Sequence, residues 1–224
     1  MSKKLDAKEY KIDKVIINYK NKPIYDFFKR TLDIFCSGLA IILLSPLLTV
    51  IAILIKLTSK GPVIYKSVRY TKNGKPFMFL KFRTMVQNAE DMHEELMEYD
   101  DGNSNGVRLK IKNDPRITKV GKFIRKTSID ELPQLFNIFG GSMSIVGPRP
   151  AIEEEIDKYG DKEMQRMLVK GGLTCIWQCS GRSNVSFEEQ INMDISYIEH
   201  RGFFYDIWLI LKTIPAVLFA KGAE

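Results

Sequence analysis

The sequence contains few cysteines and few histidines, and several well-known catalytic motifs are missing from it. Its three cysteines are too few and too unevenly spaced for the disulfide framework of a small secreted domain. Cys175, Cys179 and His200 would supply three ligands of a zinc site, but no fourth ligand follows at a suitable spacing. No Walker loop, dinucleotide-binding glycine pattern or nucleophile elbow occurs. These absences favour a reduced, intracellular protein outside those enzyme classes.

Acidic residues are missing from a long part of the chain, and uncharged apolar runs are scarce. No Asp or Glu occurs between Asp33 and Glu90, whereas lysine and arginine flank the uncharged run at 34–55 on both sides. The net charge is +7 and the isoelectric point is about 9.2. With 224 residues and one such run, the chain is not a polytopic transporter, because each span takes about 20 residues. The charge pattern indicates an anionic partner: a membrane surface, a phosphate substrate or a nucleic acid.

Ser45 and Pro46 interrupt the apolar run near its middle. A straight helix of about 22 residues would be ~33 Å long and would cross a bilayer. Pro46 lacks an amide hydrogen and its ring crowds the carbonyl of Ile42, so we expect a kink in which the Ser45 hydroxyl bonds a freed carbonyl. Since both flanks are basic, a re-entrant hairpin with both ends on the cytoplasmic face is one solution. A spanning helix with a tolerated proline and a buried core helix are the alternatives.

A β-hairpin is predicted next, with strands at 63–70 and 76–85 joined by an Asn-Gly turn. Alternation along the second strand places Lys81 and Arg83 on one face of an otherwise apolar segment. They are interpreted either as two surface charges with buried stems or as a phosphate clamp.

The remaining segments give coarser predictions. Residues 1–22 are lysine-rich and predict either an interfacial helix or a loose arm. Residues 86–99 predict an acidic amphipathic helix. The C-terminal segment 203–224 predicts a helix lying in a membrane interface with Trp208 at headgroup level, or alternatively a core helix.

Asp130 and Glu131 form an adjacent carboxylate pair with two interpretations. Ser128 and Glu131 fit a capping box, and Asp130 suits a first helical turn, so both carboxylates have structural explanations. Pro133 indicates that a helix begins nearby. The same place suits chemistry, because a helix N-terminus lowers the pKa of a carboxylate and keeps it ionised. An ionised Asp130 can attack phosphorus, and Glu131 can bind Mg²⁺.

Two glycine-containing segments each present an arginine. Gly147–Pro150 predicts a rigid loop carrying Arg149, and the segment 170–184 carries Arg182 near its end. Arginine suits bidentate contacts with phosphate, although a turn with an exposed arginine is the simpler interpretation.

Together these segments resemble small bacterial phosphoglycosyl transferases, which are monotopic polyprenyl-phosphate sugar-1-phosphate transferases. The resemblance extends from about Asp26 to the C-terminus, with the motifs in the family order. Besides the Ser-Pro interruption, the matching motifs are KFRTM (81–85), RKTSIDELPQLFNIF (125–139), SIVGPRP (144–150), GGLTCIWQCSGR (171–182) and YDIWLILKT (205–213). One departure is Cys175, where family members often have glycine, which leaves the local backbone conformation open.

The resemblance implies an α+β fold: a re-entrant, Ser-Pro-broken N-terminal membrane helix, a small β-hairpin and interfacial amphipathic helices packed around one catalytic domain. It divides the chain into a polar basic arm (1–25), a re-entrant membrane helix hairpin (26–58) and a catalytic domain with interfacial helices (59–224). The implied location is monotopic, on the cytoplasmic face of the bacterial inner membrane.

The resemblance also implies an activity. Such enzymes transfer a sugar 1-phosphate from a UDP-sugar to undecaprenyl phosphate, release UMP and begin the assembly of capsule, exopolysaccharide or other lipid-linked glycans. By this likeness Asp130 is the nucleophile of a covalent phosphosugar intermediate and Glu131 binds Mg²⁺. The residues matching the family's phosphate and substrate contacts are Lys81, Arg83, Arg125, Arg149, Arg182 and Asp206.

The expected partners are the UDP-sugar, undecaprenyl phosphate and an anionic membrane surface, and self-association into a homo-oligomer is compatible with the sequence. Nucleic acid is not expected, because the basic residues are not interleaved with aromatic side chains as single-strand binders require. The alternative function is a membrane-tethered, non-catalytic binding or scaffold module of a polysaccharide assembly complex.

Overall fold

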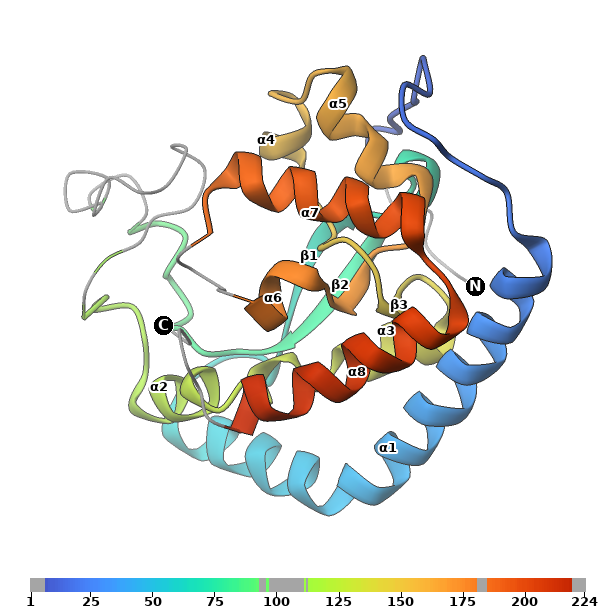
Figure 1. Ribbon diagram of the computed structural model, residues 1–224. Helices are drawn as coiled ribbons and strands as arrows, with labels where there is room; N and C mark the ends of the chain where they lie inside the picture. The colour runs from blue at the N-terminus through green and yellow to red at the C-terminus, as the bar shows by residue number, and fades with distance from the viewer. Residues whose placement is uncertain (1–6, 93–95, 97–110, 112, 181–184, 219–224) are drawn as a thin grey trace.

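The computed structural model describes residues 7–92, 96, 111, 113–180 and 185–218. A long N-terminal helix runs around the outside of a group of shorter helices and two small sheets (Figure 1). The α-helices are α1 (Pro23–Thr58), α2 (Lys119–Lys126), α3 (Gln134–Gly140), α4 (Glu153–Ile156), α5 (Asp161–Met164), α6 (Ile176–Ser180), α7 (Phe187–His200) and α8 (Phe203–Leu218). The strands are β1 (Ile64–Tyr70), β2 (Pro76–Phe82), β3 (Ser144–Val146) and β4 (Gly172–Thr174), and the 3₁₀ turns are η1 (Lys72–Gly74), η3 (Ile129–Glu131) and η4 (Gln165–Leu168).

The long helix α1 contains the Ser-Pro interruption without ending there. Figure 1 shows that α1 descends along one side of the molecule and then turns along its lower edge. The Ser45 hydroxyl donates a 2.8 Å hydrogen bond to the Ile42 carbonyl, which confirms the expected compensation for Pro46. In the described chain, α1 is the helix that is long and apolar enough to cross a membrane, and only 11% of its most apolar window is buried. The core-helix alternative is therefore wrong, and both membrane arrangements stay open.

The predicted hairpin is present as an antiparallel pair of β1 and β2. Asn73 and Gly74 have φ angles of 60° and 65°, so the Asn-Gly turn is confirmed. The second strand is shorter than predicted and ends at Phe82. Because β1 begins at Ile64, which pairs with Phe82, the chain beyond β2 has no further strand partner in β1. It turns instead toward the segment before α2 and forms a bridge between Met85 and Ile117.

Two apolar clusters attach this hairpin to the helices. One cluster joins α3 and α1 to β2, and the other joins α1 and α2 to the end of β2. The first contains Phe77, Phe79, Leu135, Ile138 and Met143, and the second contains Ile51, Ile55, Phe82 and Ile124. Between them, Asn137 donates to the Met78 carbonyl at 2.7 Å and accepts from the Leu80 amide at 3.0 Å. The segment linking α2 to α3 is therefore held at a defined place beside β2.

A parallel pair, β3 and β4, lies at the centre, with α7 and α8 packed on it. The two chains approach closely here, since a Cβ atom on Gly172 would lie 2.1 Å from the Gly147 amide nitrogen. The loop after β3 is therefore held against β4 by contact that only glycine permits.

Of the lysine-rich segment 1–22, the structure describes residues 7–22, and these form neither an interfacial helix nor a loose arm, whereas residues 1–6 lie outside the described residues. Residues 7–22, here called the strap, are non-helical and bind across the molecule. The Tyr10 and Tyr70 rings pack edge to face, with their centroids 5.0 Å apart. Gln165 donates to the Lys14 carbonyl at 2.8 Å, and Lys22 donates to the Arg201 carbonyl at 2.6 Å. The lysine-rich composition of the strap therefore did not predict its contacts with distant elements.

The helix predicted at 86–99 is wrong for the residues that the structure describes there. Residue 86 has no regular structure, and residues 87–92 and 96 form turns. The amide of Val86 donates to the Arg116 carbonyl at 2.9 Å, so long-range pairing replaces the first helical turn. At the other end of the chain, α8 begins at Phe203 and exposes 86% of Phe204 and 48% of Trp208.

Candidate active site

The carboxylate pair lies in a short 3₁₀ turn between α2 and α3. Ser128 adopts a left-handed conformation with φ of 57° and ends the α2 segment, and Pro133 caps α3. The Ser128 side chain makes no capping hydrogen bond, so the capping-box interpretation of Glu131 is wrong. The reversal at Ser128 instead turns Asp130 and Glu131 toward β2.

Lys81 of β2 meets both carboxylates. Its Nζ lies 3.4 Å from Asp130 Oδ2 and 3.0 Å from Glu131 Oε1. The Asp130 side chain is 9% exposed, whereas those of Lys81 and Glu131 are 23% and 25% exposed. The cluster therefore combines a nearly buried carboxylate with a bridging ammonium and a second, more accessible carboxylate.

The pKa of Asp130 is raised above its ordinary value, contrary to the prediction from a helix N-terminus. Burial is the largest cause, because a charged carboxylate loses water there. Lys81 opposes this by favouring the ionised form, adjacent Glu131 adds to the rise, and Arg125 lowers the pKa. The prediction was wrong because η3 is a single turn with a weak dipole, whereas burial depends on the tertiary packing.

The arginines predicted to surround phosphates are placed differently from one another. Arg125, in α2, is close enough to favour ionised Asp130. Arg149 lies in the loop after β3, and its carbonyl accepts a 3.4 Å hydrogen bond from Arg166 Nη2. Arg182 lies outside the described residues.

Arg83 does not share the partners of Lys81. Its Nη2 donates to the Ser59 carbonyl at 2.9 Å and to the Ser59 hydroxyl at 2.7 Å, at the C-terminal end of α1. The alternation that predicted a common face for Lys81 and Arg83 stops where β2 ends, at Phe82. The structure thus brings Lys81, but not Arg83, to the Asp130 and Glu131 carboxylates.

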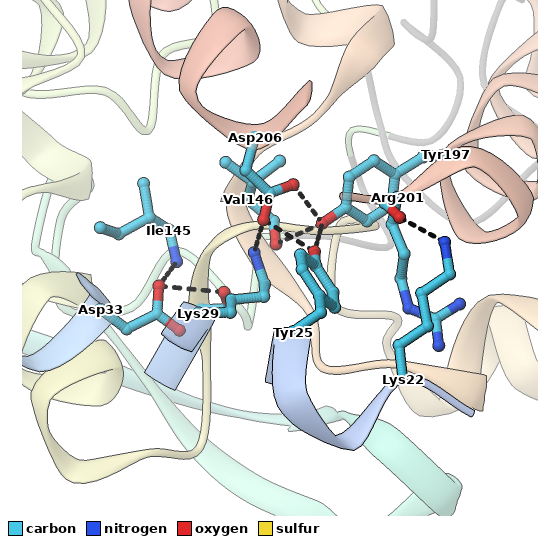
Figure 2. Close-up of polar contacts among 10 residues, drawn as sticks. Lys22, Tyr25, Lys29, Asp33, Ile145, Val146, Tyr197, Arg201 and Asp206 are labelled. Carbon is cyan, nitrogen blue, oxygen red and sulfur yellow. Dashed lines mark hydrogen bonds and ion pairs between the residues drawn. The ribbon is translucent and has the colours of Figure 1, made fainter. Parts of the chain in front are cut away.

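Asp206 belongs to a separate polar cluster where α8 meets α1 and α7 (Figure 2). It accepts hydrogen bonds from Lys29 Nζ and the Tyr25 hydroxyl at 2.7 Å each, and from the Tyr197 hydroxyl at 2.9 Å. Figure 2 also shows Asp33 of α1 accepting from the Ile145 amide at 2.9 Å. Within the described part of the chain, the hydrogen bonds of Asp206 go to α1 and α7 rather than to the Lys81 cluster.

Two cations near these sites were not predicted from the sequence. Lys29 pairs with Asp206, and no local pattern distinguishes it from its basic neighbours. Arg69, in β1, has its guanidinium carbon 5.2 Å from the Phe79 ring centre, and the Lys81 ammonium lies 6.0 Å from the same ring. The hairpin register, which follows from the Asn-Gly turn, was the signal that would have placed Arg69 on the same face of the hairpin as Lys81.

A divalent metal is compatible with the carboxylate pair. Among the described residues, no group of three or more His, Cys, Asp or Glu side chains is arranged to hold a metal ion. Mg²⁺ in phosphate chemistry is commonly held by one or two carboxylates together with substrate phosphates, so such a group is not needed. The partly exposed Glu131 carboxylate has the chemistry that this mode requires.

Comparisons with known proteins give the family of this chain. The family model described as bacterial sugar transferase matches residues 24–220. The exopolysaccharide production protein ExoY of Rhizobium meliloti is 39% identical over 204 residues, which cover 90% of this chain and 90% of ExoY.

Two longer relatives show the same likeness. The undecaprenyl-phosphate galactose phosphotransferase of Salmonella typhimurium is 43% identical over 200 residues, covering 88% of this chain and 42% of that relative. The UDP-glucose:undecaprenyl-phosphate glucose-1-phosphate transferase of Klebsiella pneumoniae is 45% identical over 203 residues, covering 87% and 40%. The chain thus spans most of ExoY but less than half of each longer relative. Because the family model covers most of its length, the chain belongs to the bacterial sugar transferase family.

Proposed function

We propose that the chain transfers a sugar 1-phosphate from a UDP-sugar to undecaprenyl phosphate and releases UMP, as the first step in assembling an exopolysaccharide, a capsule or another lipid-linked glycan. The names of the Salmonella and Klebsiella relatives support this acceptor, and the name of ExoY supports a role in exopolysaccharide production. The observation that carries the proposal is the nearly buried Asp130 carboxylate, held beside Glu131 and 3.4 Å from Lys81. The donor sugar stays open, because relatives are named for galactose, glucose and N-acetylgalactosamine.

The proposed chemistry is a double displacement at phosphorus. A carboxylate oxygen of Asp130 attacks the phosphorus that bears the sugar, the bond to the bridging oxygen breaks, and UMP leaves with that electron pair. This forms a covalent phosphosugar on Asp130. A phosphate oxygen of undecaprenyl phosphate then attacks the same phosphorus, and Asp130 leaves as a carboxylate. Each step forms one P–O bond and breaks one.

The cations around Asp130 have complementary roles in this proposal. Lys81 favours the ionised, nucleophilic form of Asp130 against the effect of burial. Arg125 acts in the same direction, and Arg149 is available for phosphate oxygens in the loop after β3. Arg182, outside the described residues, keeps its proposed phosphate role from the motif alone.

Glu131 is the residue proposed to hold Mg²⁺. Bound there, the ion would neutralise diphosphate charge and make UMP a better leaving group. Asp130, Lys81 and the arginines perform the binding and orienting roles described above.

The chain is proposed to act on the cytoplasmic face of the inner membrane, with α1 as a re-entrant helix. The bend of α1, the Ser45 bond to the Ile42 carbonyl and the basic flanks support this arrangement. In this arrangement the phosphate of undecaprenyl phosphate would lie at the depth of the lipid headgroups. The Asp130 site would then face the anionic membrane surface and reach that phosphate.

The test is UMP release from a panel of UDP-sugars by the purified full chain, with Mg²⁺ and undecaprenyl phosphate. We expect release with at least one donor, and a loss on the order of 10³-fold or more in Asp130→Asn. Before acceptor is added, the enzyme incubated with a sugar-labelled donor should carry label, and Asp130→Asn should carry none.

Membrane association provides the control. Asp130→Asn should still co-sediment with membranes, because the exposed apolar residues of α1 and α8 are unchanged. A folded, membrane-bound wild-type chain that releases UMP from no donor would contradict the proposal and favour the scaffold alternative.

A further inference from the structure

Arg69 lies between the carboxylate cluster and the loop that carries Arg149. In the β1–β2 register Arg69 pairs with Phe77, and Tyr65 pairs with Lys81. Paired residues of an antiparallel ladder share a face, and so do residues two apart along a strand. Arg69 and Lys81 therefore project from one face of the hairpin, the face on which Lys81 reaches Asp130.

The Arg69 and Lys81 cations both lie near the Phe79 ring. It is 6% exposed, with the Arg69 guanidinium carbon 5.2 Å and the Lys81 ammonium 6.0 Å from its centre. The distances fit cation–π contacts, which orient a cation without using its hydrogen-bond donors. The N–H groups of Arg69 thus remain available for other partners.

Arg69 uses few of those donors in the structure. Its Nη1 donates to the Pro150 carbonyl at 3.3 Å. Its Nε is buried and has no hydrogen-bond partner among the described residues. A guanidinium carries five N–H donors and cannot readily lose its charge, so the half-buried Arg69, with its buried Nε unpaired, has capacity for an anion.

The charges around Arg69 also favour the binding of an anion. The pKa of Arg69 is lowered to about 10, first by burial and then by the positive charge of Arg149, while Glu155 and Glu131 oppose the change. Two guanidinium groups close enough to repel each other are stabilised when an anion enters between them.

We infer that Arg69 binds the diphosphate of a nucleoside-diphosphate donor together with Arg149. Arg69 joins the β-hairpin to the Gly147–Pro150 loop through the Pro150 carbonyl, so one residue connects the anion contacts of both segments. This inference rests on the proposed function for the identity of the donor, but the anion site itself is argued from the contacts of Arg69.

The test measures binding of three probes to the purified full chain in lipid nanodiscs with Mg²⁺ present: UDP, UMP and uridine. We expect Arg69→Gln to weaken UDP binding by about 10-fold or more, which is the range for losing a charge-assisted contact. UMP should lose less affinity, and uridine should bind as it does to the wild type. Arg69→Lys should restore part of the UDP affinity, because it keeps the charge but not the planar fork.

Lys66→Gln is the matched control, since Lys66 lies on the same strand, is exposed and carries the same charge. It should bind UDP as the wild type does, which excludes a general effect of net charge. Equal UDP affinity in Arg69→Gln and the wild type would overturn the inference. So would an equal loss of UDP and uridine affinity without rescue by lysine, since that pattern indicates a structural role.

The outcomes also separate this inference from the proposed function. If the wild-type chain releases UMP from a UDP-sugar while Arg69→Gln leaves UDP affinity unchanged, the inference fails and the function stands. If no UDP-sugar is turned over but UDP affinity still depends on Arg69, the anion site stands and the proposed function fails.

Discussion

At the scale of single residues, the Lys81 ammonium favours the ionised form of Asp130 against the effect of burial. Burial raises the pKa of Asp130, and Lys81 is the largest opposing influence. Burial and Lys81 thus act on the pKa of Asp130 in opposite directions, and the nucleophilic role requires the ionised form that Lys81 favours.

Replacing Lys81 tests this balance. In Lys81→Met the pKa of Asp130 should rise further, because the cause that lowers it is removed. The acidic limb of the kcat/KM profile for UMP release should therefore move to higher pH, and kcat/KM at the optimum should fall by about 10²-fold. Lys81→Arg, which keeps the charge, should leave the limb nearer the wild-type position. A limb that stays in place or moves to lower pH in Lys81→Met would contradict this assignment.

A second residue-scale prediction concerns the buried pair of Arg166 and Asp194. Asp194 Oδ2 accepts from Arg166 Nε at 2.8 Å, and the two side chains are 1% and 7% exposed, respectively. Asp194→Asn should lower the free energy of unfolding by about 3–5 kcal/mol, since it leaves a buried guanidinium without its counter-charge.

The double replacement Arg166→Met with Asp194→Leu should cost clearly less than Asp194→Asn, because no charge is then left unpaired. Denaturant unfolding of the three chains in matched detergent measures both effects. If the double variant were as unstable as the single one, the loss would come from packing rather than from the unpaired charge.

At the scale of elements, the site depends on how closely α2 approaches the segment that follows β2. A Cβ atom on Gly121 would lie 1.9 Å from the Thr84 carbonyl oxygen, so only glycine permits this approach. The contact sets the position of the α2 end from which the chain reverses at Ser128 into Asp130.

Alanine at two helical glycines tests the close approach. Gly121→Ala should destabilise the fold by about 1–3 kcal/mol, because the Thr84 backbone cannot yield as a flexible side chain would. Gly140, near the end of α3, has no atom within 4 Å of its added Cβ, and Gly140→Ala should be neutral or stabilising by up to about 1 kcal/mol. Thermal unfolding compares the pair, and equal effects at both positions would show that helix propensity alone is at work.

At the scale of the whole molecule, the exposed apolar residues of α1 and α8 suggest a common membrane surface. Phe204 is 86% exposed and Trp208 is 48% exposed on α8, while α1 exposes Leu57 at 78%. Exposed aromatic and aliphatic side chains in this number are unusual for a protein surrounded by water. The re-entrant arrangement of α1 is the prediction that decides how this surface meets the lipid.

Labelling of single cysteines tests that arrangement. In a chain whose native cysteines are replaced by serine, Asn21→Cys and Lys60→Cys place one thiol near each end of α1. An impermeant thiol reagent added outside intact spheroplasts should label neither, because both ends lie in the cytoplasm. Labelling of either thiol in this background would indicate a spanning helix.

Pro46→Ala should increase labelling at one end of α1, since it restores a straight helix that is long enough to span. Pro215→Ala, the equivalent change inside α8, is the control and should leave the pattern unchanged.

The sequence alone determined the features that depend on neighbours along the chain. The Asn-Gly turn, the Ser45 bond to the Ile42 carbonyl and the helix start at Pro133 each follow from local backbone chemistry. The adjacent carboxylates were identified as a candidate site from their residue types and the motif around them.

Tertiary structure decided what depends on partners far away in the sequence. Contacts between distant segments bind the strap across the molecule, and the described part of the helix predicted at 86–99 forms turns. Arg83 donates to Ser59, whereas Lys81 contacts Asp130. Tertiary structure also reversed the expected shift of the Asp130 pKa, because burial exceeded the local dipole. Burial, hydrogen bonds between distant residues and the field of distant charges arise only when the chain packs. The local pattern therefore identified the reactive groups, whereas packing determines their neighbours and shifts their pKa values.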